Sequence, residues 1–125
     1  MLEEELLKDL RDIGINVPFT LNVRGYSKTY FGRYDPNTNK VILYPYKTPK
    51  GDMYSYLDIL LTAVHECSHC IQWSDPTFVR YKGIMHDAEF KKLYGKYSNR
   101  ARAKMLFKEV TESGKSDFEA QKMYS

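Results

Sequence analysis

The segment that most constrains the fold is Leu60–Trp73, with the sequence LLTAVHECSHCIQW. Its apolar residues recur at the spacing of one helical face, so we expect a helix over Met53–Trp73 with Asp52 as its N-cap. Within this helix, His65 and His69 are four residues apart. That spacing places both imidazoles on one face, with their Cβ atoms about 5–6 Å apart.

Two imidazoles held in this way can coordinate one zinc ion. Glu66 follows the first histidine and can reach a water molecule on that zinc, so the pattern His-Glu-x-x-His supplies two ligands and a general base. The alternative is a solvated helix surface, which the apolar face and a further candidate ligand downstream disfavour. We therefore predict one catalytic Zn²⁺, with Glu66 as the catalytic residue.

A catalytic zinc also needs a third protein ligand and one open position for water. Asp75 stands where metzincins place a ligand, but Gln72 replaces the glycine that their sharp turn requires. Cys70 points to another side of the helix, and Glu89 lacks the acidic pattern that orients such a ligand in gluzincins. His86, the only other histidine, precedes a predicted helix and is the ligand that we prefer.

The remaining periodicities predict an α+β fold, because three strands precede most of the helices. Alternation predicts the strands and 3.6-residue periodicity the helices. The expected strands are Phe19–Val23, Lys28–Tyr34 and Lys40–Tyr44, the last two joined as a hairpin by DPNTN. The other expected helices are Leu2–Ile13, Asp87–Tyr97 and Asn99–Glu112, with a loop over 78–85 and a short segment over 116–123.

The charge of the chain is unevenly distributed. The segment Arg80–Lys108 carries nine lysines and arginines against two acids, so its net charge is +7 and the rest of the chain is −4, for a total of +3. A basic segment favours a polyanionic partner. The alternative, a solvated helical face, is equally compatible with the pattern.

The two cysteines and the N-terminus bear on the compartment. Cys67 and Cys70 lie one helical turn apart, so a disulfide between them would be strained, and we expect free, packed thiols in a reducing compartment. The acidic N-terminus differs from a secretory signal, and no apolar run is long enough to cross a bilayer. The sequence therefore predicts a cytoplasmic protein without a membrane partner.

The histidine motif and the segment around His86 together resemble a known family. The segment HECSHCIQW, followed by GIMHDAEFKKLY, resembles the SprT-like metalloproteases, which include the Spartan proteases of DNA–protein crosslinks. In that family a motif of the type GHGPEF carries the third zinc ligand, and His86 matches this histidine. Glu89 and Phe90 match its E-F, whereas Asp87 and Ala88 replace its Gly-Pro. The resemblance covers about 39–97, including the strand NKVILYP.

The resemblance implies a single SprT-like domain over 1–125, with a core at about 15–97 and a basic helical segment at 98–125. It implies a minimal zincin-like fold, in which a three-stranded sheet packs on the active-site helix and further helices follow. The implied function is zinc-dependent hydrolysis of peptide bonds in DNA-associated or DNA-crosslinked proteins. The residues that we expect to contact DNA are Arg100, Arg102, Lys104 and Lys108.

We expect the protein substrate to pair in extended form with a sheet edge, for which Lys40–Tyr44 is the candidate. A second oxyanion donor, a tyrosine or a backbone N–H, is also expected, whereas Trp73 and the pair Tyr94 and Tyr97 are interpreted as core. Two other functions stay open. One is a non-enzymatic, zinc-stabilised DNA-binding module, and the other is an ImmA/IrrE-like protease that cleaves a repressor and takes an acidic third ligand.

Overall fold

The computed structural model describes residues 1–75 and 88–112, with side chains up to residue 108. Within these ranges the chain forms three helices and a three-stranded sheet, which confirms the α+β class. The elements in chain order are α1 (Leu2–Asp12), β1 (Thr20–Val23), β2 (Gly32–Asp35), β3 (Lys40–Leu43), α2 (Tyr56–Ser74) and α3 (Ala88–Glu112). The predicted loop over 78–85 and the segment over 116–123 lie outside the described residues.

The order of the strands in the sheet is β1-β3-β2, so β3 is central. It pairs in parallel with β1 and antiparallel with β2, the second pairing being the predicted hairpin. Val41, Ile42 and Leu43 are all buried, as is typical of a strand covered on both faces. The prediction that Lys40–Tyr44 forms a sheet edge is therefore wrong, and β2 and β1 are the two edge strands.

Strand β2 begins four residues later than the sequence predicted. The hydroxyl of Ser27 accepts hydrogen bonds from the backbone N–H groups of Thr29 and Tyr30, at 3.1 and 3.0 Å. These side-chain bonds give the backbone a turn conformation in place of the ladder. At the other end, Asp35 accepts bonds from Asn37 and Thr38 and closes the hairpin turn, as its sequence indicated.

Helix α2 begins at Tyr56, and its N-cap is Ser55, whose hydroxyl accepts a hydrogen bond from the N–H of Asp58 at 3.2 Å. The predicted start at Met53 with Asp52 as cap is wrong. The two residues before the cap are held in extended pairing, because Met53 bridges to Tyr46 and Tyr54 donates to the carbonyl of Pro45. The predicted end near Asp75 is confirmed, since this residue is the C-cap.

Helix α3 is one continuous helix, whereas the sequence predicted two helices separated at Ser98. Ser98 and Ala101 are buried against the body of the protein, which favours continuation through the polar stretch. The hydroxyl of Ser98 donates to the carbonyl of Gly95 at 3.2 Å, so it is satisfied within the helix. Burial of small residues on one face thus overrides the local tendency of serine and asparagine to end a helix.

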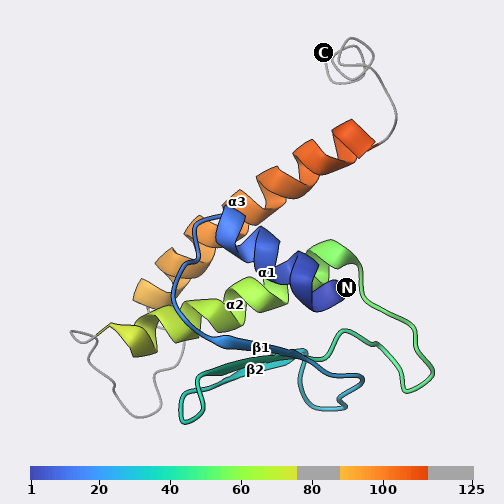
Figure 1. Ribbon diagram of the computed structural model, residues 1–125, viewed down its shortest axis with the longest axis horizontal. Helices are drawn as coiled ribbons and strands as arrows, with labels where there is room; N and C mark the ends of the chain where they lie inside the picture. Colours follow the sequence, from blue (N-terminus) through green and yellow to red (C-terminus); the bar gives the residue numbers. More distant parts are fainter. Residues whose placement is uncertain (76–87, 113–125) are drawn as a thin grey trace.

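The elements form layers, with the sheet on one side, α2 and α1 against it, and α3 against α2 (Figure 1). One apolar core connects them. Its fully buried members include Leu6, Leu10, Ile15, Val41, Leu60, Ala63, Val64, Cys67 and Ala101. Within the described ranges, no helix combines the length and the apolar character that crossing a bilayer requires.

Candidate active site

His65 and His69 project from the middle of α2 on the same face, as their spacing predicted. Their ring centroids are 5.2 Å apart, with the rings edge to face. The His65 side chain is 36% exposed, whereas His69 is buried beneath it. Phe90 of α3 stacks on His69 at 4.3 Å and meets His65 edge-on at 4.9 Å. One histidine is thus accessible to a ligand, and the other is held firmly by an aromatic ring.

The opposite face of α2 anchors the histidines, because it is embedded in the core. Cys67 belongs to that core, and the Cys70 thiol lies near the carbonyl of Pro18 and the side chain of Asn39, at 3.8 and 3.5 Å. Burial raises the pKa of both thiols, which keeps them protonated. The prediction of free, packed cysteines is confirmed, and the Cys70 thiol makes its contacts away from the histidine face.

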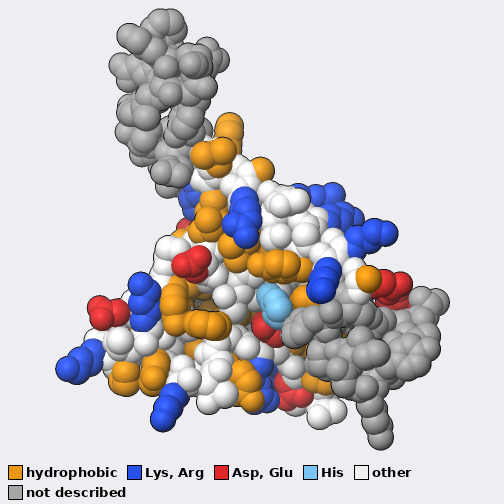
Figure 2. Space-filling model, turned by 180° about the vertical axis from the view of Figure 1, so that it is seen from behind, with side chains coloured by type: hydrophobic (Ala, Val, Ile, Leu, Met, Phe, Trp, Pro, Cys, Tyr) orange, Lys and Arg blue, Asp and Glu red, His pale blue; other side chains and the backbone are white. Residues whose placement is uncertain are grey.

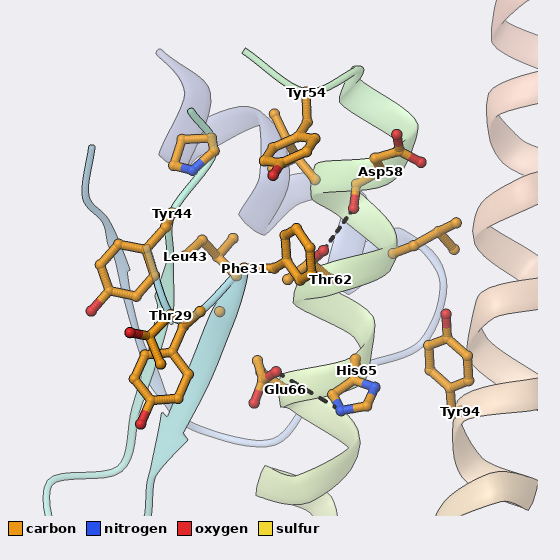
Figure 3. A pocket seen from close by; sticks show the side chains of 15 residues that line it. Thr29, Phe31, Leu43, Tyr44, Tyr54, Asp58, Thr62, His65, Glu66 and Tyr94 are labelled. Atoms are coloured by element: carbon orange, nitrogen blue, oxygen red, sulfur yellow. Dashed lines mark hydrogen bonds and ion pairs between the residues drawn. The ribbon is translucent and has the colours of Figure 1, made fainter. Parts of the chain in front are cut away.

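Glu66 lies on the sheet side of α2, where its side chain is 10% exposed. Burial raises the pKa of this carboxyl to about 7, although a hydrogen bond from the backbone N–H of Tyr34 opposes the shift. Its Oε2 atom is 4.0 Å from Nε2 of His65 (Figure 3). A carboxyl with this pKa can accept or donate a proton near neutral pH.

The donor set of these side chains meets part of what zinc requires. Two imidazoles on a rigid helix are suitable ligands, and an adjacent carboxyl is suited to act as a base rather than a ligand. Within residues 1–75 and 88–112, no third histidine, cysteine, aspartate or glutamate completes a metal-binding group with them. Glu89 is exposed in the first turn of α3, and His86 lies outside the described residues. The described side chains therefore fit two of the three ligands of a catalytic zinc.

A cavity of about 610 Å³ opens beside these residues, between β2, α2 and α3. His65 and Glu66 lie at one end of its lining (Figure 3), and Figure 2 shows a histidine at the surface of this face with apolar side chains beside it. The aromatic wall formed by Phe31 and Tyr54 was not predicted from the sequence, because these residues come from segments expected only to be a strand and a helix terminus. The tyrosine-rich segments on both sides of the hairpin are the signal that could have indicated it.

Tyr94 was interpreted as core, and the structure gives it two roles. Its ring packs against the core and also lines the cavity, 5.6 Å from the ring of His65. The Tyr94 ring is parallel to the Phe90 ring, and their centroids are 6.3 Å apart. Within the described chain, its hydroxyl has no hydrogen-bond partner. A phenol hydroxyl therefore lies near the two histidines at one end of the cavity.

Three of the four residues expected to contact DNA are engaged with α1. Arg100 donates to the carbonyl of Ile13 at 3.0 Å, and Lys108 pairs with Glu5 at 2.9 Å. Lys104 pairs with Asp12 at 3.2 Å and lies 3.7 Å from Asp9. The fourth residue, Arg102, is exposed on α3. The basic segment and the acidic N-terminus, which the sequence showed as separate features, are thus partners in one interface.

No protein-family model matches this sequence, and no curated protein is significantly similar to it. Among solved structures, the chain is similar to the metallopeptidase zymogen of Pyrococcus abyssi abylysin, with a TM-score of 0.51. The match covers 86% of this chain and 94% of that chain at 16% sequence identity. At this identity the likeness shows the fold alone, so it supports the zincin-like architecture coarsely.

Proposed function

We propose that this protein is a zinc-dependent endopeptidase of the SprT-like type. His65 and His69 would hold the metal, with His86 as the third ligand. The observation that carries the proposal is the placement of two adjacent imidazoles and a buried glutamate at the end of one cavity. When bound, zinc would lower the pKa of its water towards about 7 and polarise the scissile carbonyl.

Glu66 is the proposed general base and acid. It takes a proton from the attacking water and later gives it to the leaving amine. Two features support this role: burial raises its pKa to about 7, and the N–H of Tyr34 holds the carboxylate in place. A zinc site with a purely structural role has no need of a buried carboxyl at this position, which disfavours the non-enzymatic alternative.

Tyr94 is the proposed oxyanion donor. Glu66 and Tyr94 lie on opposite sides of His65 (Figure 3), so a scissile carbonyl between them would have its base on one side and a phenol on the other. The Tyr94 ring is held by Phe90 and His65, which limits its movement. A positioned hydroxyl donor stabilises the negative charge that develops on the carbonyl oxygen.

The free edge of β2 is the proposed binding site for the substrate backbone. The carbonyl of Phe31 accepts a hydrogen bond from Tyr44 of the neighbouring strand. Because backbone groups alternate in direction along a strand, those of Gly32 and Tyr34 point to the opposite, open edge. Tyr34 uses its N–H for Glu66, which leaves the N–H and carbonyl of Gly32 facing the cavity. An extended peptide can pair with them by β-augmentation.

The substitution Glu66→Gln tests the proposal when zinc content and cleavage of an unfolded protein such as casein are measured together. We expect one equivalent of zinc to be retained and the cleavage rate to fall at least about 100-fold. Glu89→Gln is the matched control, because Glu89 is an exposed glutamate near the site, and it should cleave normally. Undiminished cleavage by a zinc-loaded Glu66→Gln protein would refute Glu66 as the base.

The third ligand has its own test. His86→Ala should lose zinc, measured by metal analysis after dialysis. Full zinc retention in this variant, combined with loss in Glu89→Gln, would instead favour an acidic third ligand of the ImmA/IrrE-like kind.

DNA-associated proteins are the substrates that the SprT-like resemblance supports. Because Arg100, Lys104 and Lys108 already contact α1, the proposed DNA contact rests mainly on exposed basic residues of α3. These are Lys91, Lys92, Lys96 and Arg102. Binding through phosphate contacts should weaken steeply as salt increases.

A further inference from the structure

The cavity beside Glu66 extends well beyond the catalytic residues, along the N-terminal half of α2. Its walls come from the segment before β2, the end of β3 and the first two turns of α2 (Figure 3). The volume of about 610 Å³ is several times that of a cavity of about 150 Å³ that holds benzene. The space therefore admits a large side chain together with part of its backbone.

Aromatic side chains form one wall of this space and remain exposed. Phe31 is 65% exposed and Tyr30 is 49% exposed, although both border a cavity. Phe31 meets Tyr54 edge to face at 5.5 Å, so the two rings hold each other at the rim. Exposed aromatic rings around a concave site are typical of ligand contacts, because the bound ligand buries them.

Gly32 allows β2 to approach α2 closely at the floor of the cavity. A Cβ atom at this position would lie 2.9 Å from Cγ2 of Thr62 and 3.0 Å from the carbonyl oxygen of Ile42. Any larger residue would force the strand and helix apart. The same glycine presents its backbone groups at the open edge, so the floor and the proposed backbone-binding edge meet at one residue.

Among lysine, arginine, aspartate and glutamate, only the acidic residues occur in the described lining of the cavity. Among the described residues that line the cavity, Asp58 and Glu66 carry the carboxyl groups, and none is a lysine or arginine. The nearby Lys47 lies over the ring of Tyr54 at 5.7 Å and does not line the cavity. An acidic side chain in this space would face these two carboxyls, and repulsion between like charges is unfavourable in a partly buried site.

We propose that this cavity is a specificity subsite that accepts a large apolar side chain, aromatic or branched aliphatic, next to the scissile bond and excludes acidic side chains. Its connection to cleavage rests on the proposed peptidase function, whereas the binding itself does not. Phe31 is the main contact, and Asp58 carries the discrimination against acids.

The direct test measures binding to the catalytically inactive Glu66→Gln protein. The probes are fluorescein-labelled heptapeptides of glycine and serine with one central residue varied, read by fluorescence anisotropy. We expect the phenylalanine and leucine peptides to bind about tenfold more tightly than the glycine peptide, because the cavity buries their apolar surface. The glutamate peptide should bind most weakly.

Two variants assign the preference to named residues. Phe31→Ala in the same background should remove most of the preference for phenylalanine, while leaving the affinity for the glycine peptide within about twofold. The matched control is Phe107→Ala, because Phe107 is also a surface phenylalanine, 72% exposed, on α3 away from the cavity. Asp58→Asn should strengthen binding of the glutamate peptide about threefold without affecting the phenylalanine peptide.

The outcomes separate this inference from the peptidase proposal. Equal affinity for the phenylalanine and glycine peptides would overturn the subsite, even if the wild-type protein cleaves casein. A preference that Phe31→Ala and Phe107→Ala alter equally would also overturn it. Selective binding by a wild-type protein that retains zinc but cleaves nothing would uphold the subsite and refute the peptidase function.

Discussion

Two polar clusters in this small protein are built on opposite principles. The ionic cluster joins α1 to α3 through Glu5, Asp9, Asp12, Lys104 and Lys108. The active-site cluster consists of His65, Glu66 and His69 on α2. In the ionic cluster each carboxyl meets an ammonium group. In the active-site cluster, within the described chain, Glu66 forms no salt bridge with a lysine or arginine.

The difference lies in how the charge of a buried carboxyl is compensated. Buried Asp9 accepts a hydrogen bond from the hydroxyl of Tyr56 at 2.6 Å and lies near Lys104, so its charge is compensated. Glu66 is nearly as buried, but burial raises its pKa to about 7. A carboxyl kept in such a place weakens the fold, and perturbed groups of this kind concentrate at functional sites.

Removal of a proposed metal ligand would break the active-site cluster most severely. His65→Ala should weaken zinc binding by more than about 100-fold and abolish cleavage, since even loss of a supporting contact to a metal ligand costs 10–100-fold. Isothermal titration with zinc measures the effect. Ser74→Ala, at the exposed end of the same helix, is the control and should bind zinc normally. Equal zinc affinity in the two variants would contradict the proposed metal site.

The proposed oxyanion donor is expected to have the next largest effect. Tyr94→Phe removes one hydroxyl and keeps the ring that packs on Phe90 and His65. We expect kcat to fall about 100-fold with KM little changed, because the hydrogen bond forms in the transition state. The melting temperature should stay the same. A loss confined to KM would instead indicate that Tyr94 only binds the substrate.

Burial of the ionised Glu66 carboxylate should lower the free energy of unfolding of the metal-free protein. Its folded-state pKa of about 7 is above the ordinary value of 4.5, so the penalty is absent below pH 4.5, grows as pH rises and is complete above pH 7. Glu66→Gln should therefore stabilise metal-free protein by about 3 kcal/mol at pH 8 and by almost nothing at pH 4.5. Urea unfolding at both pH values measures this, and a pH-independent effect would contradict it.

The smallest effects are expected in the ionic cluster. Lys104→Ala should lower the free energy of unfolding by about 1 kcal/mol, because it leaves Asp9 with Tyr56 as its remaining polar contact. Arg102→Ala, on the exposed face of α3, should change it by less than about 0.5 kcal/mol. If DNA binds this face, Arg102→Ala should weaken DNA binding more than Lys104→Ala does. The slope of log affinity against log salt concentration should then fall by about one for Arg102→Ala.

Local patterns predicted a substantial part of this molecule. The periodicity of α2 and the four-residue spacing of His65 and His69 depend on helical geometry alone, so they could be derived from neighbouring residues. The hairpin turn was likewise readable, because Asp35 binds its own local backbone. The N-cap of α2 was misplaced because Met53 pairs with Tyr46, and this bridge, which helical periodicity does not report, delays the start of the helix.

By itself, the sequence determined the α+β class, the helix of the candidate active site and the placement of His65 and His69 on one of its faces. The tertiary structure decided that β3 is central and β2 is the edge beside Glu66. It also decided that the basic face of α3 pairs with α1. The physical reason is range: helical periodicity acts over four residues, whereas strand order and ion pairing join residues separated by as many as 103 positions.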